Sequence, residues 1–233
     1  NSPVLYKENG FKKKEDAEHL IGELSEKPAG PVTVTGIDKK KENKNAPLLY
    51  NLAELQNDCS KYFKISPDET LRIVQELYEK KMTTYPRTDA RVLSTAVAKE
   101  IHKNIGGLRN YALAAPFARE VLEQGTYKNI AKTRYVNDKQ ITDHYAIIPT
   151  GQGLNNLAGL APTAAKVYEV IVRRFLSIFY PPAVYQKFSL TLQVKEESFF
   201  ASFKVLIQEG YLKVTNFSFK KENTALKEDK ENE

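Results

Sequence analysis

The sequence predicts an α+β protein in which a helical domain is inserted into a mainly antiparallel β domain. Three observations support this prediction. Apolar residues recur at helical spacing through residues 47–180, they alternate with polar residues in residues 181–219, and another alternating stretch precedes the helical part. The most economical arrangement joins residues 1–46 and 181–219 into one discontinuous β domain. Residues 220–233 form a charged tail with almost nothing to bury, which predicts disorder.

The N-terminal part combines a helix with a strand. Residues 14–25 carry apolar side chains on one face and predict a short amphipathic helix. Residues 31–37 alternate valine with threonine, which predicts a half-buried strand. The following run, residues 38–45, is rich in lysine and asparagine, and we expect a solvated loop there.

Capping residues mark the first helices of the middle part. Asn51 can cap a helix that reaches Phe63, and Ser66 with Glu69 forms a capping box for a second helix. That second helix is expected to end near Lys81. Its expected buried residues are Leu71, Val74, Leu77 and Tyr78, and further helices are predicted over residues 94–105, 117–124 and 163–179.

The period changes after the proline pair 181–182. Residues 188–194 and 199–206 alternate apolar and polar side chains, which predicts two antiparallel strands with one wet face. Gly210 then precedes a third predicted strand that runs through Val214.

Charge is distributed unevenly along the chain. The formal net charge is +6, and all the arginines lie within residues 46–178. Arginine is well suited to bidentate phosphate contacts, so we expect this part to face nucleic acid. The candidate DNA-binding residues are Arg91, Arg134, Arg173 and Arg174.

The composition also limits the compartment and the class of site. No apolar run approaches the ~20 residues of a membrane span, and the single cysteine, Cys59, cannot form an internal disulfide. Cys59 falls on an apolar helix face, so packing explains it better than reactivity. The few histidines and the cysteine show no metal-ligand spacing, and we expect a cytoplasmic protein without a metal site in this chain.

The chemistry concentrates in the stretch from Met82 to Ala90. Pro86 disfavours helical geometry at Tyr85, so the backbone is expected to be extended and to place Tyr85 and Arg87 on the same side. A phenol can attack phosphorus, and a guanidinium can hold two phosphate oxygens. A surface turn with an ordinary exposed tyrosine is the alternative interpretation, since Tyr-Pro and Thr-Asp pairs are common in turns.

Three segments resemble the type IA DNA topoisomerases, closest to the topoisomerase III branch. Residues 84–89, Thr-Tyr-Pro-Arg-Thr-Asp, are similar to the active-site signature of that family. Residues 47–56 resemble the segment that leads into its tyrosine domain, and residues 143–150 resemble its histidine motif. The three segments occur in the family's order.

The resemblance implies the fold and the roles of three residues. It implies a CAP-like, winged-helix tyrosine domain inserted into a β arch domain. Tyr85 would form a 5′-phosphotyrosyl bond with one strand of single-stranded DNA, and a second strand would pass through the gap without ATP. Arg87 would stabilise the transition state, and His144 would bind the scissile phosphate or shuttle a proton.

The resemblance also concerns parts outside this chain. The family holds Mg²⁺ on a separate Toprim domain with an Asp-x-Asp motif, and no two aspartates here are separated by one residue. We therefore expect this chain to be a fragment without the Toprim domain, and we expect that domain to be its main partner. Alone, the fragment is expected to bind no cofactor and to cleave no DNA. A monomeric enzyme associated with the bacterial nucleoid is implied.

Two other functions compete with this interpretation. The helices that lead into a short extended segment also fit a non-catalytic winged-helix module that binds DNA. A tyrosine recombinase fits poorly, because its arginine-lysine-histidine-x-x-arginine set has no match around His19, His102 or His144.

Overall fold

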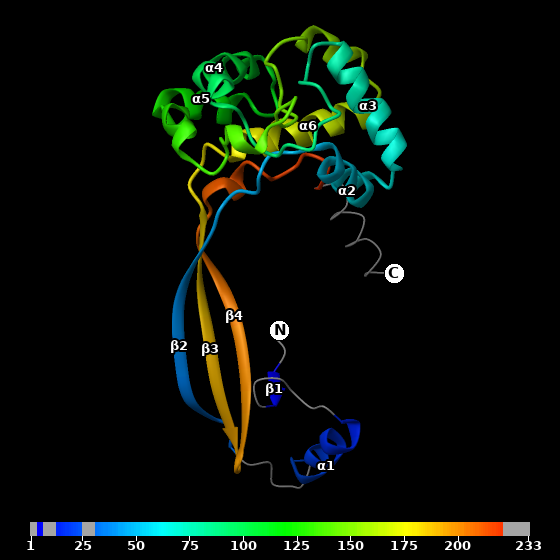
Figure 1. The fold of residues 1–233 in the computed structure, drawn as a ribbon. Helices are drawn as coiled ribbons and strands as arrows, with labels where there is room; N and C mark the ends of the chain where they lie inside the picture. The colour runs from blue at the N-terminus through cyan, green and yellow to red at the C-terminus, as the bar shows by residue number, and fades with distance from the viewer. Residues whose placement is uncertain (1–3, 7–12, 25–30, 221–233) are drawn as a thin grey trace. The chain divides into compact units, whose positions relative to one another are not determined.

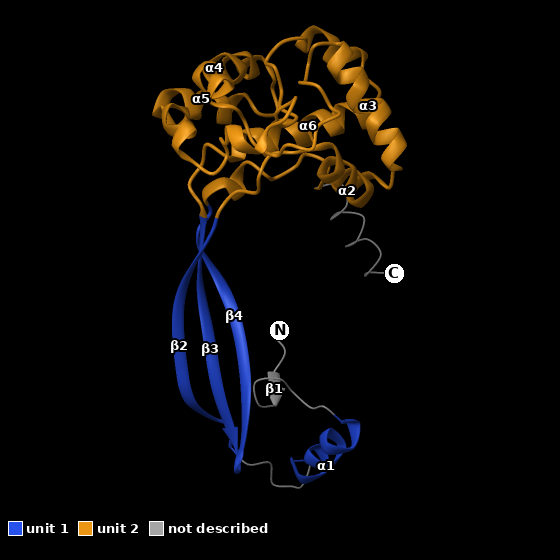
Figure 2. Cartoon of the chain, viewed as in Figure 1, with its two compact units in different colours: residues 1–44, 183–209 blue, residues 45–182, 210–233 orange. Residues whose placement is uncertain are grey.

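The protein is described by a computed structural model that covers residues 4–6, 13–24 and 31–220. The chain divides into two compact units, one of residues 1–44 with 183–209 and the other of residues 45–182 with 210–233 (Figure 2). The predicted disorder of the charged tail lies outside the described residues, apart from Lys220. Mixed α and antiparallel β structure, as predicted, is confirmed.

The β unit contains one antiparallel sheet in the order β1-β4-β3-β2. Strands β2, β3 and β4 run side by side over most of their length (Figure 1). The elements of this unit are β1 (Val4–Tyr6), α1 (Lys14–Leu24), β2 (Thr33–Lys44), β3 (Ala183–Val194) and β4 (Glu197–Gln208). The predicted helix and both predicted C-terminal strands are therefore confirmed.

The predicted loop over residues 38–45 is wrong, because β2 continues to Lys44. Each residue from Ile37 to Lys44 pairs with a residue of β3, so the backbone hydrogen bonds of this polar run come from its neighbour. The strand lies at the edge of the sheet. Lysine-rich edge strands are a common protection against pairing with other chains.

The sheet is more exposed than predicted. Val34 in β2 is 50% exposed, and Val205 and Ile207 in β4 are 47% and 53% exposed. All residues of β4 from Ser202 onward are exposed, whichever face they lie on. The predictions of a half-buried strand over residues 31–37 and of a single wet face are therefore wrong for these strands.

The helical unit is organised around α6, which lies between the α2–α3 pair and the α4–α5 pair (Figure 1). Apolar residues from Val167 to Phe175 on this helix are fully buried. The helices of the unit are α2 (Leu52–Phe63), α3 (Pro67–Glu79), α4 (Thr95–Gly107), α5 (Ala115–Gln124) and α6 (Pro162–Ser177), with 3₁₀ turns η1 (Leu108–Asn110), η2 (Thr126–Lys132), η3 (Asp138–Gln140), η4 (Leu154–Gly159) and η5 (Gly210–Lys213).

The predicted caps are confirmed in detail. The Asn51 side chain accepts a hydrogen bond from the Glu54 amide at 2.8 Å, and the Ser66 hydroxyl accepts one from the Glu69 amide at 3.1 Å. Cys59 is fully buried on α2, and burial raises the pKa of its thiol to about 12. The thiolate is therefore disfavoured at neutral pH, as expected for a packing residue.

The third predicted strand after Gly210 is wrong, because the chain turns there. Gly210 has φ +56°, and a Cβ at this position would lie 2.4 Å from the carbonyl oxygens of Pro181 and Pro182. The turn carries the chain into the helical unit, where Tyr211 and Val214 are buried. Residues 210–219 therefore belong to the helical unit and not to the β domain in which we expected them.

Aromatic packing and one buried ion pair hold this last segment. The ring centroids of Phe217 and Phe219 lie 5.5 and 5.8 Å from that of Tyr62 on α2. The Glu169 carboxylate of α6 accepts hydrogen bonds from the amide and hydroxyl of Ser218, at 2.8 and 2.6 Å. Arg173 pairs with the same carboxylate at 2.8 Å.

Arg173 is buried and has partners inside the protein, which does not fit the expectation that it faces DNA. Arg173 is 5% exposed, and its guanidinium also donates to the carbonyls of Val214 and Leu113, at 3.0 and 3.2 Å. The side chain thus connects α6 to two other segments and compensates the buried charge of Glu169.

Replacing this arginine should destabilise the helical unit strongly. Arg173→Ala should lower its free energy of unfolding by about 3–5 kcal/mol, because the Glu169 carboxylate would remain buried without its cation. Urea unfolding followed by circular dichroism measures this. Arg72→Ala is the control, since Arg72 is exposed and 3.6 Å from Glu69, and such a pair is worth at most ~1 kcal/mol. Equal losses in the two variants would contradict this role of Arg173.

Candidate active site

The three segments singled out in the sequence lie together in the helical unit. In chain order, the first segment is residues 47–56, the second is residues 84–89 and the third is residues 143–150. The Leu52 amide donates to the Thr88 carbonyl at 3.1 Å, which joins the first segment to the second. The Ile147 amide donates to the Tyr50 carbonyl at 2.8 Å, which joins the third segment to the first. Segments distant in sequence therefore share one network of backbone hydrogen bonds.

Two threonines on either side of Tyr85 connect its segment to the histidine segment. The Thr84 hydroxyl donates to the Ala146 carbonyl and accepts from the Ile148 amide, both at 3.0 Å. The Thr88 hydroxyl donates to the His144 carbonyl at 3.1 Å. These bonds fix the backbone before and after Tyr85 relative to the backbone of His144.

The connection places the Tyr85 and His144 rings at one cavity of about 400 Å³. The ring centroids of Tyr85 and His144 are 4.4 Å apart, with an angle of 41° between the planes. The Tyr78 ring meets Tyr85 edge-on, with the centroids 5.3 Å apart. The cavity is lined by Tyr78, Lys81, Thr83, Thr84, Tyr85, His144, Tyr145, Thr150 and Gln152.

Tyr78 and Lys81 are cavity residues that the sequence analysis missed. Tyr78 was expected to be buried on α3, but it is 39% exposed. Periodicity predicts which face of a helix is apolar, but it cannot show that the end of that face is left uncovered by the rest of the fold. The one feature of the sequence that could have indicated both residues is their position directly before the tyrosine motif.

Burial distinguishes the tyrosines of the cavity. Burial raises the pKa of the Tyr145 phenol, which keeps this hydroxyl protonated and poorly suited to attack. Thr83 is 1% exposed, and its hydroxyl has no hydrogen-bond partner within residues 4–6, 13–24 and 31–220. An unpaired buried hydroxyl is costly.

Arg87 lies beside the cavity and is not one of its lining residues. The backbone is not extended here as predicted: the Thr88 amide donates to the Pro86 carbonyl at 3.0 Å and closes a three-residue turn over Arg87. The alternation argument that placed Arg87 and Tyr85 on the same side therefore does not apply. The Arg87 side chain is exposed, and it has no ion pair or hydrogen bond among the residues that the structure describes.

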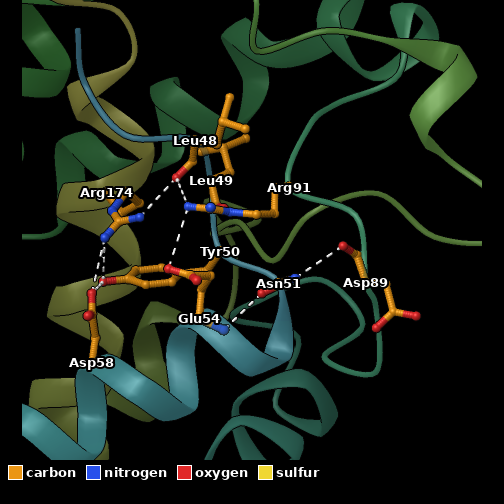
Figure 3. A network of polar contacts seen from close by, with 9 residues as sticks. All are labelled: Leu48, Leu49, Tyr50, Asn51, Glu54, Asp58, Asp89, Arg91 and Arg174. Atoms are coloured by element: carbon orange, nitrogen blue, oxygen red, sulfur yellow. Dashed lines mark hydrogen bonds and ion pairs between the residues drawn. The ribbon is translucent and has the colours of Figure 1, made fainter. Parts of the chain in front are cut away.

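Arg91 and Arg174 hold the first segment in place (Figure 3). Arg174 donates to the Leu48 carbonyl at 2.9 Å, and Arg91 donates to the Leu49 carbonyl at 3.2 Å. Arg91 also lies 3.7 Å from the Glu54 carboxylate. Both guanidiniums therefore have internal partners, and a contact with DNA would compete with those partners.

Tyr50 is the centre of the same network. Its hydroxyl donates to the Asp58 carboxylate, and Arg174 lies 3.1 Å from that carboxylate and 4.0 Å from the centroid of the Tyr50 ring (Figure 3). Burial raises the pKa of the Tyr50 phenol well above its ordinary range. This tyrosine is thus a structural donor, and the contacts of Arg174 are explained by packing. Arg134 is exposed, and within the part of the chain that the structure describes its guanidinium contacts only the Tyr135 ring, at 5.8 Å from the ring centroid.

Two features are absent from the part of the chain that the structure describes, namely a cluster of metal-ligating side chains and a helix that could span a membrane. Within residues 4–6, 13–24 and 31–220, no three histidine, cysteine, aspartate or glutamate side chains gather where they could hold a metal ion. In the same ranges, no helix is both long and apolar enough to cross a membrane.

Comparison with known sequences shows a family. The sequence model of a family described as DNA topoisomerase matches residues 4–233. A DNA topoisomerase 3 of Bacillus cereus (strain ATCC 14579) is 35% identical, over 88% of this chain and 28% of the relative. The enzyme of the same name from Bacillus subtilis (strain 168) is 35% identical, over 76% of this chain and 24% of the relative. This chain therefore spans about a quarter of the length of these curated relatives.

Comparison with solved structures shows a similar fold in a topoisomerase. Full-length topoisomerase I from Thermotoga maritima superposes with a TM-score of 0.62 at 20% identity, over 93% of this chain and 34% of that one. Since the family match extends over almost the whole sequence, the chain belongs to the DNA topoisomerase family, and its resemblance to type IA enzymes of the topoisomerase III branch is confirmed.

Proposed function

We propose that this chain is the part of a type IA DNA topoisomerase that carries the nucleophile, and that Tyr85 attacks a phosphate of single-stranded DNA. The observation that carries the proposal is the Tyr85 ring at an open cavity with the His144 ring 4.4 Å away. A nucleophile next to a group that can accept a proton is the usual arrangement for covalent catalysis. The buried tyrosines of the unit lack this access.

The proposed step exchanges one phosphodiester for another. The Tyr85 oxygen forms a bond to phosphorus, and the bond from phosphorus to the 3′ oxygen of the preceding nucleotide breaks. The phenol loses its proton, and the departing 3′ oxygen gains one. His144 is the proposed group that accepts or shuttles this proton, or that donates a hydrogen bond to the phosphate. Because one phosphoester replaces another, the reverse attack by the 3′ hydroxyl reseals the strand without ATP.

Arg87 is proposed to stabilise the charge that develops on the phosphate. Its side chain is exposed two residues from Tyr85, and no partner among the described residues occupies its guanidinium. A guanidinium can bind two phosphate oxygens at once, and it can do so without breaking an existing ion pair here. Arg134 is also exposed, with its guanidinium 5.8 Å from the Tyr135 ring centroid, and is a proposed DNA contact, whereas Arg91 and Arg174 would have to leave internal partners.

The metal is proposed to come from another part of the enzyme. The relatives named DNA topoisomerase 3 are about four times as long as the matched region, which leaves room for the Toprim domain that the resemblance implies. Since the described residues have no acidic cluster, no step of this proposal uses a metal bound by them.

The sharpest test is the covalent adduct. Alone, the chain should not cleave DNA at any Mg²⁺ concentration, but when combined with the Toprim domain of its parent enzyme it should form a 5′ adduct. Tyr85→Phe should remove the adduct, and Arg87→Ala should slow cleavage by ~10²–10³ while DNA binding stays nearly intact, the usual cost of losing one transition-state donor. Arg87→Lys should restore only part of the rate.

The readout is a denaturing gel of 3′-labelled oligonucleotide with peptide mapping. Tyr145→Phe is the matched control, since Tyr145 lines the same cavity, and it should leave the adduct in place. An adduct that survives Tyr85→Phe or maps elsewhere would overturn the assignment. DNA binding without any adduct would favour the non-catalytic winged-helix module instead.

Binding should favour single strands. The chain should bind single-stranded DNA more tightly than duplex, with strong salt dependence, because exposed aromatic and cationic side chains such as Tyr78 and Arg134 can contact unpaired bases and phosphates. Fluorescence anisotropy titrations with both DNA forms at several salt concentrations measure this. Equal affinity for duplex DNA, or affinity independent of salt, would contradict the expectation.

A further inference from the structure

Helix α3 ends in a turn that normally requires glycine. The Lys81 amide donates to the Tyr78 carbonyl at 2.8 Å, and the Met82 amide donates to the Leu77 carbonyl at 2.9 Å. These two bonds define a Schellman motif, whose residue after the helix adopts a left-handed conformation. Lys81 occupies that position with φ +60°. A side chain there is strained, because its Cβ crowds the backbone.

The backbone cannot relax out of this conformation. The Thr150 hydroxyl donates to the Lys81 carbonyl at 2.5 Å, and the Asn156 amide group donates to the Lys80 carbonyl at 3.3 Å. Gly153 approaches so closely that a Cβ there would lie 2.4 Å from the Lys80 oxygen. The turn is therefore fixed from outside, and any residue other than glycine at position 81 must accept the strain.

The strained residue is one of those that line the Tyr85 cavity. Lys81 is the one lysine or arginine among the described residues that line this cavity, together with Tyr85 and His144. It is exposed, and no ion pair or hydrogen bond engages its ammonium group within residues 13–24 and 31–220. Its neighbour Lys80, in contrast, pairs with Glu76 at 3.0 Å.

We propose that Lys81 binds a DNA phosphate in the Tyr85 cavity, an inference that rests on the proposed function. A strained backbone that is kept at a functional site indicates that the side chain has a role there. An ammonium on a flexible stem is a point charge that can follow a phosphate without a fixed geometry. Lys81 is thus the cation in the lining of the cavity as described, whereas Arg87 is not one of its lining residues.

The partial negative charge at the C-terminus of a helix stabilises a nearby lysine, which could explain Lys81 without any role in DNA binding. Lys64 is the matched control for this effect. Lys64 ends α2 with φ +57°, and its amide donates to the Ser60 carbonyl at 3.1 Å. It is exposed and does not line the Tyr85 cavity. Lys64 therefore shares the conformation, the charge and the helix dipole with Lys81, but not the cavity.

The test replaces each lysine by glycine and measures both stability and DNA affinity. Lys81→Gly and Lys64→Gly should each raise the melting temperature by about 2 °C, because both relieve left-handed strain. Only Lys81→Gly should weaken binding of a labelled single-stranded oligonucleotide, by roughly 3- to 10-fold at low salt, and reduce the slope of log affinity against log salt by about 0.7. Thermal unfolding and fluorescence anisotropy are the readouts.

Two further variants separate charge from backbone. Lys81→Arg should keep the affinity, and Lys81→Ala should lose as much affinity as Lys81→Gly without the gain in melting temperature. If the unaltered chain binds DNA and Lys81→Gly binds it with the same affinity and salt slope, the inference is overturned and the proposed function is not. An equal loss in Lys64→Gly would also overturn the inference. Absence of binding by the unaltered chain would overturn the proposed function together with it.

Discussion

The candidate site depends on hydrogen bonds among three largely buried segments that have almost no regular secondary structure. Residues 46–52, 82–93 and 144–150 pass through the interior of the helical unit, where their amides and carbonyls cannot be satisfied by water. They bond to one another instead, as the Thr84 amide does to the Ile148 carbonyl at 3.0 Å. Because the bonds are mutual, no segment can move without leaving polar groups of another unpaired.

This constraint explains why a site on irregular chain can be well defined. Loops usually position side chains poorly, since few contacts fix them. Here the threonine hydroxyls at 84 and 88 add side-chain bonds to the backbone network on either side of Tyr85. The Tyr50–Asp58–Arg174 cluster then anchors the first segment to α2 and α6. The helices contribute rigidity, and the three segments contribute Tyr85, Arg87 and His144 of the candidate site.

Sequence reasoning succeeded where the determining interactions are local. The caps at Asn51 and Ser66 act over three residues, so the helix starts could be predicted correctly. It failed where a distant partner decides. The polar run after Ile37 is a strand because β3 pairs with it, and Gly210 begins a turn because Pro181 and Pro182 lie against it. No pattern within these segments contains that information.

The arginines show the same limit at the site. Their confinement to the middle of the chain predicts a part that faces nucleic acid, but it could not separate Arg173, which is 5% exposed, from the exposed Arg134. That separation depends on Glu169, a buried carboxylate on the same helix four residues earlier. Such a Glu-Arg pair is equally common on solvated helix faces. Burial decides the role of Arg173, and burial is a property of the whole fold.

Burial also distinguishes Tyr85, which is half-buried, from the fully buried tyrosines of this unit. It raises the pKa of the Tyr50, Tyr111 and Tyr168 phenols, which therefore stay protonated and act, at most, as hydrogen-bond donors. A nucleophile needs the opposite environment, with access for substrate and positive charge nearby. The cavity offers both, since it opens beside the Tyr85 ring and Lys81 lies in its lining. Under the proposed function, the strain held at Lys81 and the partial exposure of Tyr85 would both serve one requirement, namely that a phosphate must reach the phenol.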